Sequence, residues 1–515
     1  MNKALFSRAG IVSGATLISR ILGFVRDAVI AMLLGAGWQS DMFFWVFRIP
    51  ELFRKCFSDG ILNLSFVPVF TRTLEEKGKA PAFDLARAAF VWSSALATVL
   101  VIAGMALAPA IVGWAEPGFA QDSGSIALTV LLSRIMMPYV VCVTVLALCM
   151  GVLNVLDHFA APALAPMILN LSIIAAAVWL SPQCVNPPVG LALGVLCGGI
   201  IQVGFQVPFL WRSGFFRFFR TRIFQPDLLK AGKQFFPAVV GAAVYPINIL
   251  TGTWMGGGLP EGSISYIYYA DRLVQFPLAL FAMSISIVLL PELSKSVVAN
   301  DVKKTSALFA QGMKLVFSIT LPAMAGLAVL RQPVVSLLFC QGAFDKTAVS
   351  QTATVLLLFS SGLWAFSGSR LFVTLYHAFS NTRPPFIAGT AAIGINVFLC
   401  LWLAPILGHV GIAISIVMAS VLHFGLLCWG AMCYLNRESR KEIIICACRS
   451  VFVSAIMGLV VIKTADLMSV YTLSGKMDLF LAIGVCILAG ITVYGLMVAV
   501  VGKMEKKLLF LVGRR

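Results

Sequence analysis

Long apolar runs alternate with short polar segments along the whole chain. Fourteen runs of roughly 20 residues stand out, and at about 1.5 Å per helical residue each can cross the hydrocarbon layer of a bilayer. The predicted spans are residues 9–35, 38–57, 86–112, 125–153, 161–180, 187–211, 232–257, 264–292, 306–330, 347–376, 386–405, 409–435, 443–464 and 478–502. The pattern predicts an all-α polytopic membrane protein with 14 transmembrane helices.

Composition agrees, because 60% of the residues are hydrophobic and 11% are charged, whereas soluble domains have about 25% charged residues. The net charge of +17 would suggest nucleic acid as the partner of a soluble protein, but the basic residues here fall in alternate loops. They include Lys3, Arg72, Lys77, Arg212, Arg217, Lys303, Lys304, Arg437, Lys441, Lys503 and Arg515. This positive-inside pattern predicts that both termini are cytoplasmic, and it indicates no nucleic-acid partner.

The chain also repeats itself at an offset near 224 residues. Asp41 and Arg48 then align with Ser265 and Arg272, and "VGLALG" (189–194) aligns with "VGIAIS" (410–415). Six helices return a chain to its starting side, so we expect two lobes of the same orientation related by a pseudo-two-fold axis along the membrane normal. The predicted parts are an N-terminal lobe (1–225), a C-terminal lobe (226–435), and helices 13 and 14 with a basic tail (436–515).

Charged residues inside the first span share one side of the predicted helix. At 100° per residue, Arg20, Arg26 and Asp27 lie within an arc of about 120° that also contains Ser19. A charge at the bilayer centre costs at least ~2.5–3.5 kcal/mol. This side is therefore predicted to line a wet cavity or an ion-pair network.

The second and eighth spans show the same feature. Each carries an arc of about 80°, formed by Asp41, Arg48, Glu51 and Lys55 in one and by Ser265, Tyr268, Arg272 and Gln275 in the other. Arg54 points elsewhere unless a kink at Pro50 redirects it. Both halves would then present an arginine to a central seam, where guanidinium groups suit phosphate or carboxylate oxygens. The alternative is that Arg20–Asp27 and Arg48–Glu51 are neutral pairs that only lock helices together.

These residues resemble a known family. "SRILGFVRDAVIAMLL" (19–34), "YYADRLVQFP" (268–277) and "LLPELSKS" (289–296) closely resemble the MurJ/MviN lipid II flippases of the multidrug/oligosaccharidyl-lipid/polysaccharide exporter superfamily. The resemblance implies two lobes around a V-shaped cavity, a groove for a polyprenyl tail at the last two helices, and a place in the bacterial cytoplasmic membrane. It implies lipid II, the undecaprenyl-pyrophosphate precursor of peptidoglycan, as substrate. The matching functional positions are Ser19, Arg20, Arg26, Asp41, Arg54, Ser265 and Arg272.

The chain departs from the family pattern at two charged positions. Glu51 stands in Pro50-Glu51-Leu52 where the family usually has asparagine, and Gln275 stands where it usually has glutamate. One carboxylate is thus gained in the second span and one is lost from the eighth. The two exchanges concern Glu51 and Gln275 as substrate contacts and leave the arginines unaffected. The residues assigned to the charge of the cavity are Asp27, Arg48, Glu51, Lys55 and Gln275.

The sequence leaves two alternatives to this function. A membrane-embedded enzyme acting on a polyprenyl phosphate needs a carboxylate cluster or a nucleophile–base pair, but none of the four histidines has a carboxylate at helical spacing. An exporter of another polyprenyl-linked glycan or of amphipathic drugs remains the nearer alternative. The expectation is a monomeric flippase among bilayer lipids, without catalytic residues, metal or cofactor, and with peptidoglycan synthesis enzymes as further partners. Membrane potential, Na⁺ or H⁺ would drive it, with Asn248 and Asn396 as polar candidates for an ion site.

Overall fold

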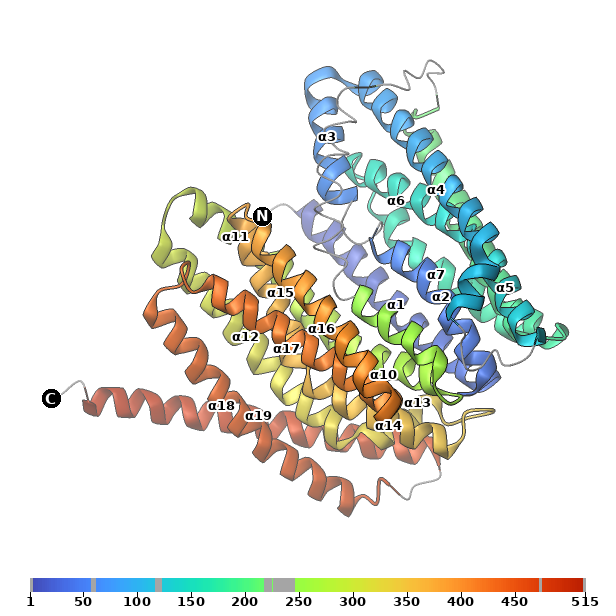
Figure 1. Ribbon diagram of the computed structural model, residues 1–515. Coiled ribbons are helices and arrows are strands. Elements are labelled where there is room, and N and C mark those ends of the chain that lie inside the picture. Colours follow the sequence, from blue (N-terminus) through green and yellow to red (C-terminus); the bar gives the residue numbers. More distant parts are fainter. Residues whose placement is uncertain are drawn as a thin grey trace. The chain divides into compact units, whose positions relative to one another are not determined.

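The computed structural model describes residues 3–56, 62–115, 123–216, 225, 246–471 and 475–512. Within these ranges every regular element is a helix (Figure 1). The chain forms two compact units. The first unit comprises Met1–Ser265 and Gln341–Asp345, and the second comprises Tyr266–Cys340 and Lys346–Arg515.

The first unit contains eight long helices. They are α1 (Lys3–Leu34), α2 (Trp38–Cys56), α3 (Leu62–Lys77), α4 (Lys79–Ala115), α5 (Ser123–Met136), α6 (Tyr139–Val155), α7 (Ala160–Ala175) and α8 (Pro187–Arg212). The first unit also includes a helical segment at residues 246–255. α7 packs against both α1 and α8. Small residues on α8 let α7 and α8 approach closely, since a Cβ added at Gly198 would lie 2.9 Å from Cδ1 of Leu169 on α7. Glycine at such positions is the usual means of bringing membrane helices together.

The second unit contains the helices from α10 onward. They are α10 (Ser263–Pro277), which begins in the first unit, α11 (Met283–Val298), α12 (Val302–Val329), α13 (Arg331–Phe339), α14 (Lys346–Ser361), α15 (Leu363–Ala378), α16 (Arg383–Leu407), α17 (His409–Ala431), α18 (Arg437–Leu467) and α19 (Lys476–Val512). Phe309 and Met313 of α12 pack with Phe372 of α15 in a buried core. α18 packs along α12, where Lys314 and Glu442 form an ion pair of 2.7 Å.

Two helix ends lie at nearly the predicted repeat offset. α6 ends with Asp157 in the left-handed conformation (φ 67°), and α15 ends with Ser380 in the same conformation (φ 54°). In both places the next residue closes a matching bond, from His158 N to Leu153 O (2.8 Å) and from Asn381 N to Tyr376 O (3.0 Å). This is the Schellman arrangement of a helix C-terminus. The same arrangement also ends α11 at Asn300 and α18 at Ser469, so it is a general feature of helix ends in this chain. The repeat and the axis relating two lobes stay predictions.

Ten helices of the described residues are long and apolar enough to cross a membrane, or eleven if the pair α14 and α15, bent by 43°, counts as one span. Three predicted spans are not among them. The spans 9–35 and 38–57 are α1 and α2, which carry the charged residues, and most of 232–257 lies outside the described residues. The count of 14 and the division into 1–225, 226–435 and 436–515 stay predictions.

The predicted span 264–292 is divided between α10 and α11, two other predicted spans are broken helices, and the short helices α3 and α13 were not predicted. The span 125–153 is α5 and α6, interrupted before Pro138, because proline disfavours a helical residue before it. The span 347–376 is α14 and α15, interrupted at Gly362. The unpredicted α3 is a short helix with a polar second half, "TRTLEEK", which lacks the apolar run of a span.

Candidate functional site

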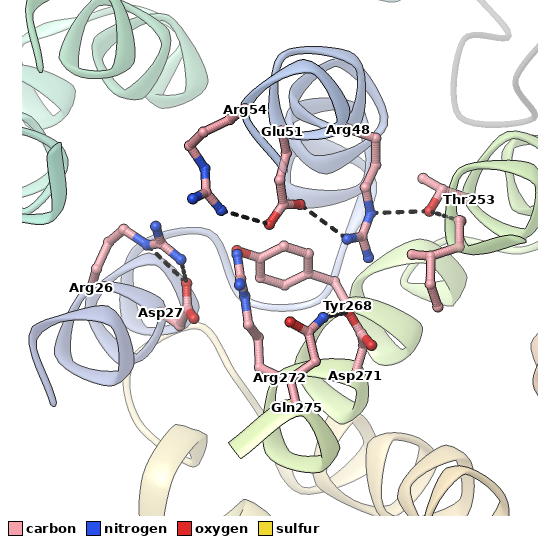
Figure 2. A network of polar contacts seen from close by, with 11 residues as sticks. Arg26, Asp27, Arg48, Glu51, Arg54, Thr253, Tyr268, Asp271, Arg272 and Gln275 are labelled. Atoms are coloured by element: carbon pink, nitrogen blue, oxygen red, sulfur yellow. Dashed lines mark hydrogen bonds and ion pairs between the residues drawn. The ribbon is translucent and has the colours of Figure 1, made fainter. Parts of the chain in front are cut away.

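Arg26 and Asp27 form a buried ion pair on α1. Nε and Nη2 of Arg26 donate to Oδ1 of Asp27 at 3.0 and 2.7 Å, and Nη1 donates to Oδ1 of Asn170 on α7 at 3.0 Å. Arg26 is 7% exposed and Asp27 is 2% exposed. Figure 2 shows the guanidinium of Arg26 facing the carboxylate. Buried charges require such partners, because an uncompensated one would cost several kcal/mol.

The buried side of α1 is the side that the sequence predicted to be polar. Arg26 and Asp27 lie on it, and Ser19 and Arg20 are half-buried. Exposed apolar residues cover the opposite side, namely Leu17, Ile18, Ile21 and Val25. α1 therefore turns its apolar side outward, as a helix in contact with lipid should.

Two arginines of α2 share one carboxylate. Nη1 of Arg48 lies 3.1 Å from Oε2 of Glu51, and Nη2 of Arg54 lies 3.8 Å from Oε1 of the same residue. Nε of Arg48 also donates to Oγ1 of Thr253 at 3.2 Å. Arg54 thus joins the polar side of α2, which contains Pro50. The side chain of Lys55 lies outside the described part of the chain.

Asp41 holds the beginning of α10. Its Oδ1 accepts the backbone N–H and the hydroxyl of Ser265 at 2.8 and 2.6 Å, and its Oδ2 accepts the N–H of Gly262 at 2.6 Å. Ser40 Oγ lies 2.8 Å from Ser265 Oγ. All four residues are in the first unit. A carboxylate at a helix N-terminus satisfies donors that have no partner within the helix.

The rest of α10 carries a second polar group. Nη2 of Arg272 donates to the hydroxyl of Tyr268 at 2.8 Å, and its guanidinium carbon lies 4.9 Å from the centre of that ring. Nε2 of Gln275 donates to Oδ2 of Asp271 at 2.6 Å (Figure 2). Asp271 is 1% exposed. Arg272 is thus held by contacts to an aromatic residue of its own helix.

Cations exceed anions among the site residues of the first unit, where Arg20, Arg26, Arg48 and Arg54 accompany Asp27, Asp41 and Glu51. An excess of guanidinium groups suits an anion with several oxygens, since each planar fork can hold two of them. Among the described residues, no group of three His, Cys, Asp or Glu could hold a metal ion.

Sequence reasoning missed three partners of the site residues, namely Asn170 (to Arg26), Thr253 (to Arg48) and Asp271 (to Gln275). Asn170 could have been noticed as the one amide in the apolar span 161–180. Thr253 carried no signal, because a threonine in an apolar helix usually bonds only to its own backbone, as Thr253 also does to Ile249 O at 2.9 Å.

Comparison with known proteins identifies the fold and the family. A solved structure described as an inward-facing multidrug resistance MATE family transporter of the MOP superfamily aligns with a TM-score of 0.67 at 14% identity, covering 85% of this chain and 99% of that one. The chain therefore has the fold of a multi-pass membrane transporter.

Closer matches show the family. A family model described as "Lipid II flippase MurJ" matches residues 30–482. The "Probable lipid II flippase MurJ" of Vibrio cholerae serotype O1 is 35% identical over 434 residues, which are 83% of each chain. A solved structure titled "Lipid II flippase MurJ, inward closed conformation" aligns with a TM-score of 0.80 at 25% identity, over 96% of this chain and 99% of that one. The chain belongs to the lipid II flippase MurJ family, a family of bacterial inner-membrane transporters and not of enzymes.

Proposed function

We propose that this protein moves lipid II from the cytoplasmic to the outer leaflet of the bacterial inner membrane. The observation that carries the proposal is the group of Arg48, Glu51 and Arg54, in which two arginines share one carboxylate. This group on α2 has more positive than negative charge, and the Arg26–Asp27 pair lies on the preceding helix, α1. An excess of positive charge suits a pyrophosphate. Guanidinium forks bind phosphate oxygens more specifically than an ammonium does.

The proposed mechanism is alternating access. Two six-helix lobes, related by a pseudo-two-fold axis along the membrane normal, rock about the arginine-lined seam while the polyprenyl tail stays in the bilayer. The alignment of Asp41 with Ser265 and of Arg48 with Arg272 at one offset supports two repeats. α18 and α19, which follow the repeat, are proposed as helices 13 and 14 that frame the groove for the tail. Alternating basic loops support two cytoplasmic termini.

We propose the membrane potential as the energy source. A pyrophosphate carries about two negative charges. When the cytoplasm is negative, moving each of these charges outward lowers the free energy by about 2.3 kcal/mol per 100 mV of membrane potential. A Na⁺ or H⁺ site is the alternative. Asn396 is fully buried, but Cys400 donates to its Oδ1 at 3.7 Å, so a helix-packing role accounts for it as well.

We further propose a monomer among bilayer lipids, with enzymes of peptidoglycan synthesis as partners and no cofactor.

Growth of a bacterial strain depleted of its own lipid II flippase tests this function. We expect the wild-type chain to support growth, and R26A and R272A to fail although they reach the membrane at normal levels. R26K and R272K should support growth only partly, because an ammonium cannot fork. R72A is the matched control, since Arg72 forms an exposed pair with Glu76 and exposed pairs contribute little. Growth failure with the wild-type chain, or normal growth with R26A and R272A, would contradict the proposal.

A further inference from the structure

Asn170 bonds to both a charged side chain and the backbone of α1. Its Oδ1 accepts from Nη1 of Arg26 at 3.0 Å, and its Nδ2 donates to the carbonyl oxygen of Ser19 at 3.0 Å. A guanidinium can only donate and a carbonyl can only accept. The two partners therefore fix the orientation of the amide. Asn170 is 7% exposed, so water does not compete strongly for these bonds.

The helices around Asn170 hold it firmly in place. α7 packs closely against α8, where Ser172 donates to the carbonyl oxygen of Gly194 at 2.8 Å, and a Cβ at Gly198 would lie 2.9 Å from Cδ1 of Leu169. On the other side lies Gly23 of α1, where an added Cβ would be in ordinary van der Waals contact with Nδ2 of Asn170, at 3.7 Å. The amide therefore reaches α1 from a rigid support.

An amide supplies an acceptor for Arg26 without adding charge. The guanidinium already faces one carboxylate, that of Asp27. A second carboxylate in place of the amide would leave a net negative group and would repel an anionic ligand. It would also place an acceptor against the carbonyl of Ser19, which offers no proton. A leucine of similar size would fill the space but would bond to neither partner.

We propose that Asn170 is a positioning residue that orients the guanidinium of Arg26 toward the pyrophosphate of the transported lipid. The inference rests on the proposed function, because it assumes that Arg26 meets this anion. Asp27 and Asn170 together use Nε, Nη1 and Nη2 of Arg26, which fixes the plane of the fork. Each of the two terminal nitrogens also carries a second N–H. A fork fixed in this plane binds an anion without first losing side-chain freedom.

Binding of purified lipid II to the full-length protein, measured by native mass spectrometry, tests the inference. We expect N170D to lower the affinity for lipid II about tenfold or more, and N170L to lower it about fivefold, since a hydrogen bond to a charged group is lost. S172A is the matched control on the same helix. It removes a bond between α7 and α8 without touching Arg26, so it should change the melting temperature but not the affinity.

Combination with R26A separates positioning from a purely structural role. If Asn170 acts through Arg26, N170L should change the affinity of R26A by less than twofold. N170D adds a charge that repels the anion in either background, so the cycle uses N170L. Equal losses from N170L in both backgrounds, or wild-type affinity of N170D and N170L, would overturn the inference. N170Q provides a further check, because it keeps the amide but displaces it by one carbon–carbon bond, and it should also weaken binding. Absence of lipid II binding by the wild-type chain would instead contradict the proposed function.

Discussion

Asp41 accepts three hydrogen bonds from the turn that begins α10, two of them from Ser265 through a single oxygen. The two residues are 224 positions apart in the sequence, which is the offset at which the sequence aligned them. Both are buried, with Asp41 2% exposed and Ser265 fully buried. The carboxylate thus acts as a helix cap supplied by another helix.

D41N should destabilise the protein more than S265A does. The amide keeps the shape of the carboxylate, but its NH2 group faces at least one of the three N–H or O–H donors that Asp41 now accepts. We expect D41N to lower the free energy of unfolding by about 2 kcal/mol and S265A to lower it by about 1 kcal/mol. Thermal unfolding of the purified protein in detergent measures both. S263A is the control, since Ser263 donates to Pro260 O and not to Asp41. An equal loss in D41N and S265A would show that the charge is not needed.

A second relationship joins the end of α1 to the segment Gln341–Asp345. Ala343 N donates to Met32 O at 3.0 Å. Gly35 (φ +64°) and Gly342 (φ +58°) are left-handed on either side, and a Cβ at Gly342 would lie 2.3 Å from Met32 O. Neither the backbone conformation nor the space accommodates a side chain there.

G342A should therefore lower the melting temperature more than G78A does. Both substitutions strain a left-handed backbone by about 1–2 kcal/mol, but Gly78 (φ +84°) has nothing within 4 Å of an added Cβ. The steric conflict at Gly342 should add about 1–3 kcal/mol. G37A, also in open space, should be nearly neutral. Equal melting temperatures for G342A and G78A would indicate that the segment moves aside at no cost.

The sequence predicted the helices and their polar sides because these depend on local spacing. Burial of Arg26 and Asp27 opposite exposed Leu17 and Ile21 follows from a period of 3.6 residues. The position of Arg54 was not predicted, because it depends on the local geometry of a helix that contains Pro50, and the sequence does not give the direction of the helix beyond a proline.

Partners far apart in the sequence were beyond local reasoning. The bond between Arg26 and Asn170 joins residues 144 positions apart, and nothing in the spacing of α1 selects a residue of α7. The pair of Arg48 and Thr253 is separated by 205 positions. The repeat predicted Asp41 and Ser265 as corresponding positions, yet only the folded chain shows that one caps the other.

Labelling of single cysteines tests the predicted topology. The chain has 12 cysteines, so we would replace all except Cys184, which is partly exposed in the loop 181–186. We expect an impermeant thiol reagent to label Cys184 from outside intact cells. In a cysteine-free chain carrying S213C, labelling should require permeabilised cells. The reverse pattern would overturn the prediction of cytoplasmic termini.

Glu51 and Gln275 differ from the residues usual in the family, which has asparagine and glutamate at these positions. We predict that the two differences compensate each other in charge. Glu51 is 2% exposed and is the carboxylate that Arg48 and Arg54 share, so E51N should impair growth support by leaving both arginines without it. Adding Q275E returns one carboxylate and recreates the arrangement usual in the family. We therefore expect the double variant to recover most of the wild-type growth rate. Additive defects in this double-mutant cycle would show that the two positions are independent.

Transport of fluorescent lipid II in vesicles that contain the purified protein tests the central claim most directly. The measured quantity is the rate at which labelled lipid in the inner leaflet becomes accessible to an impermeant quencher. We predict that the wild-type protein raises this rate well above that of protein-free vesicles, and that R26A and R272A leave it at the protein-free level. A wild-type rate equal to that of empty vesicles, or wild-type rates for R26A and R272A, would contradict the account.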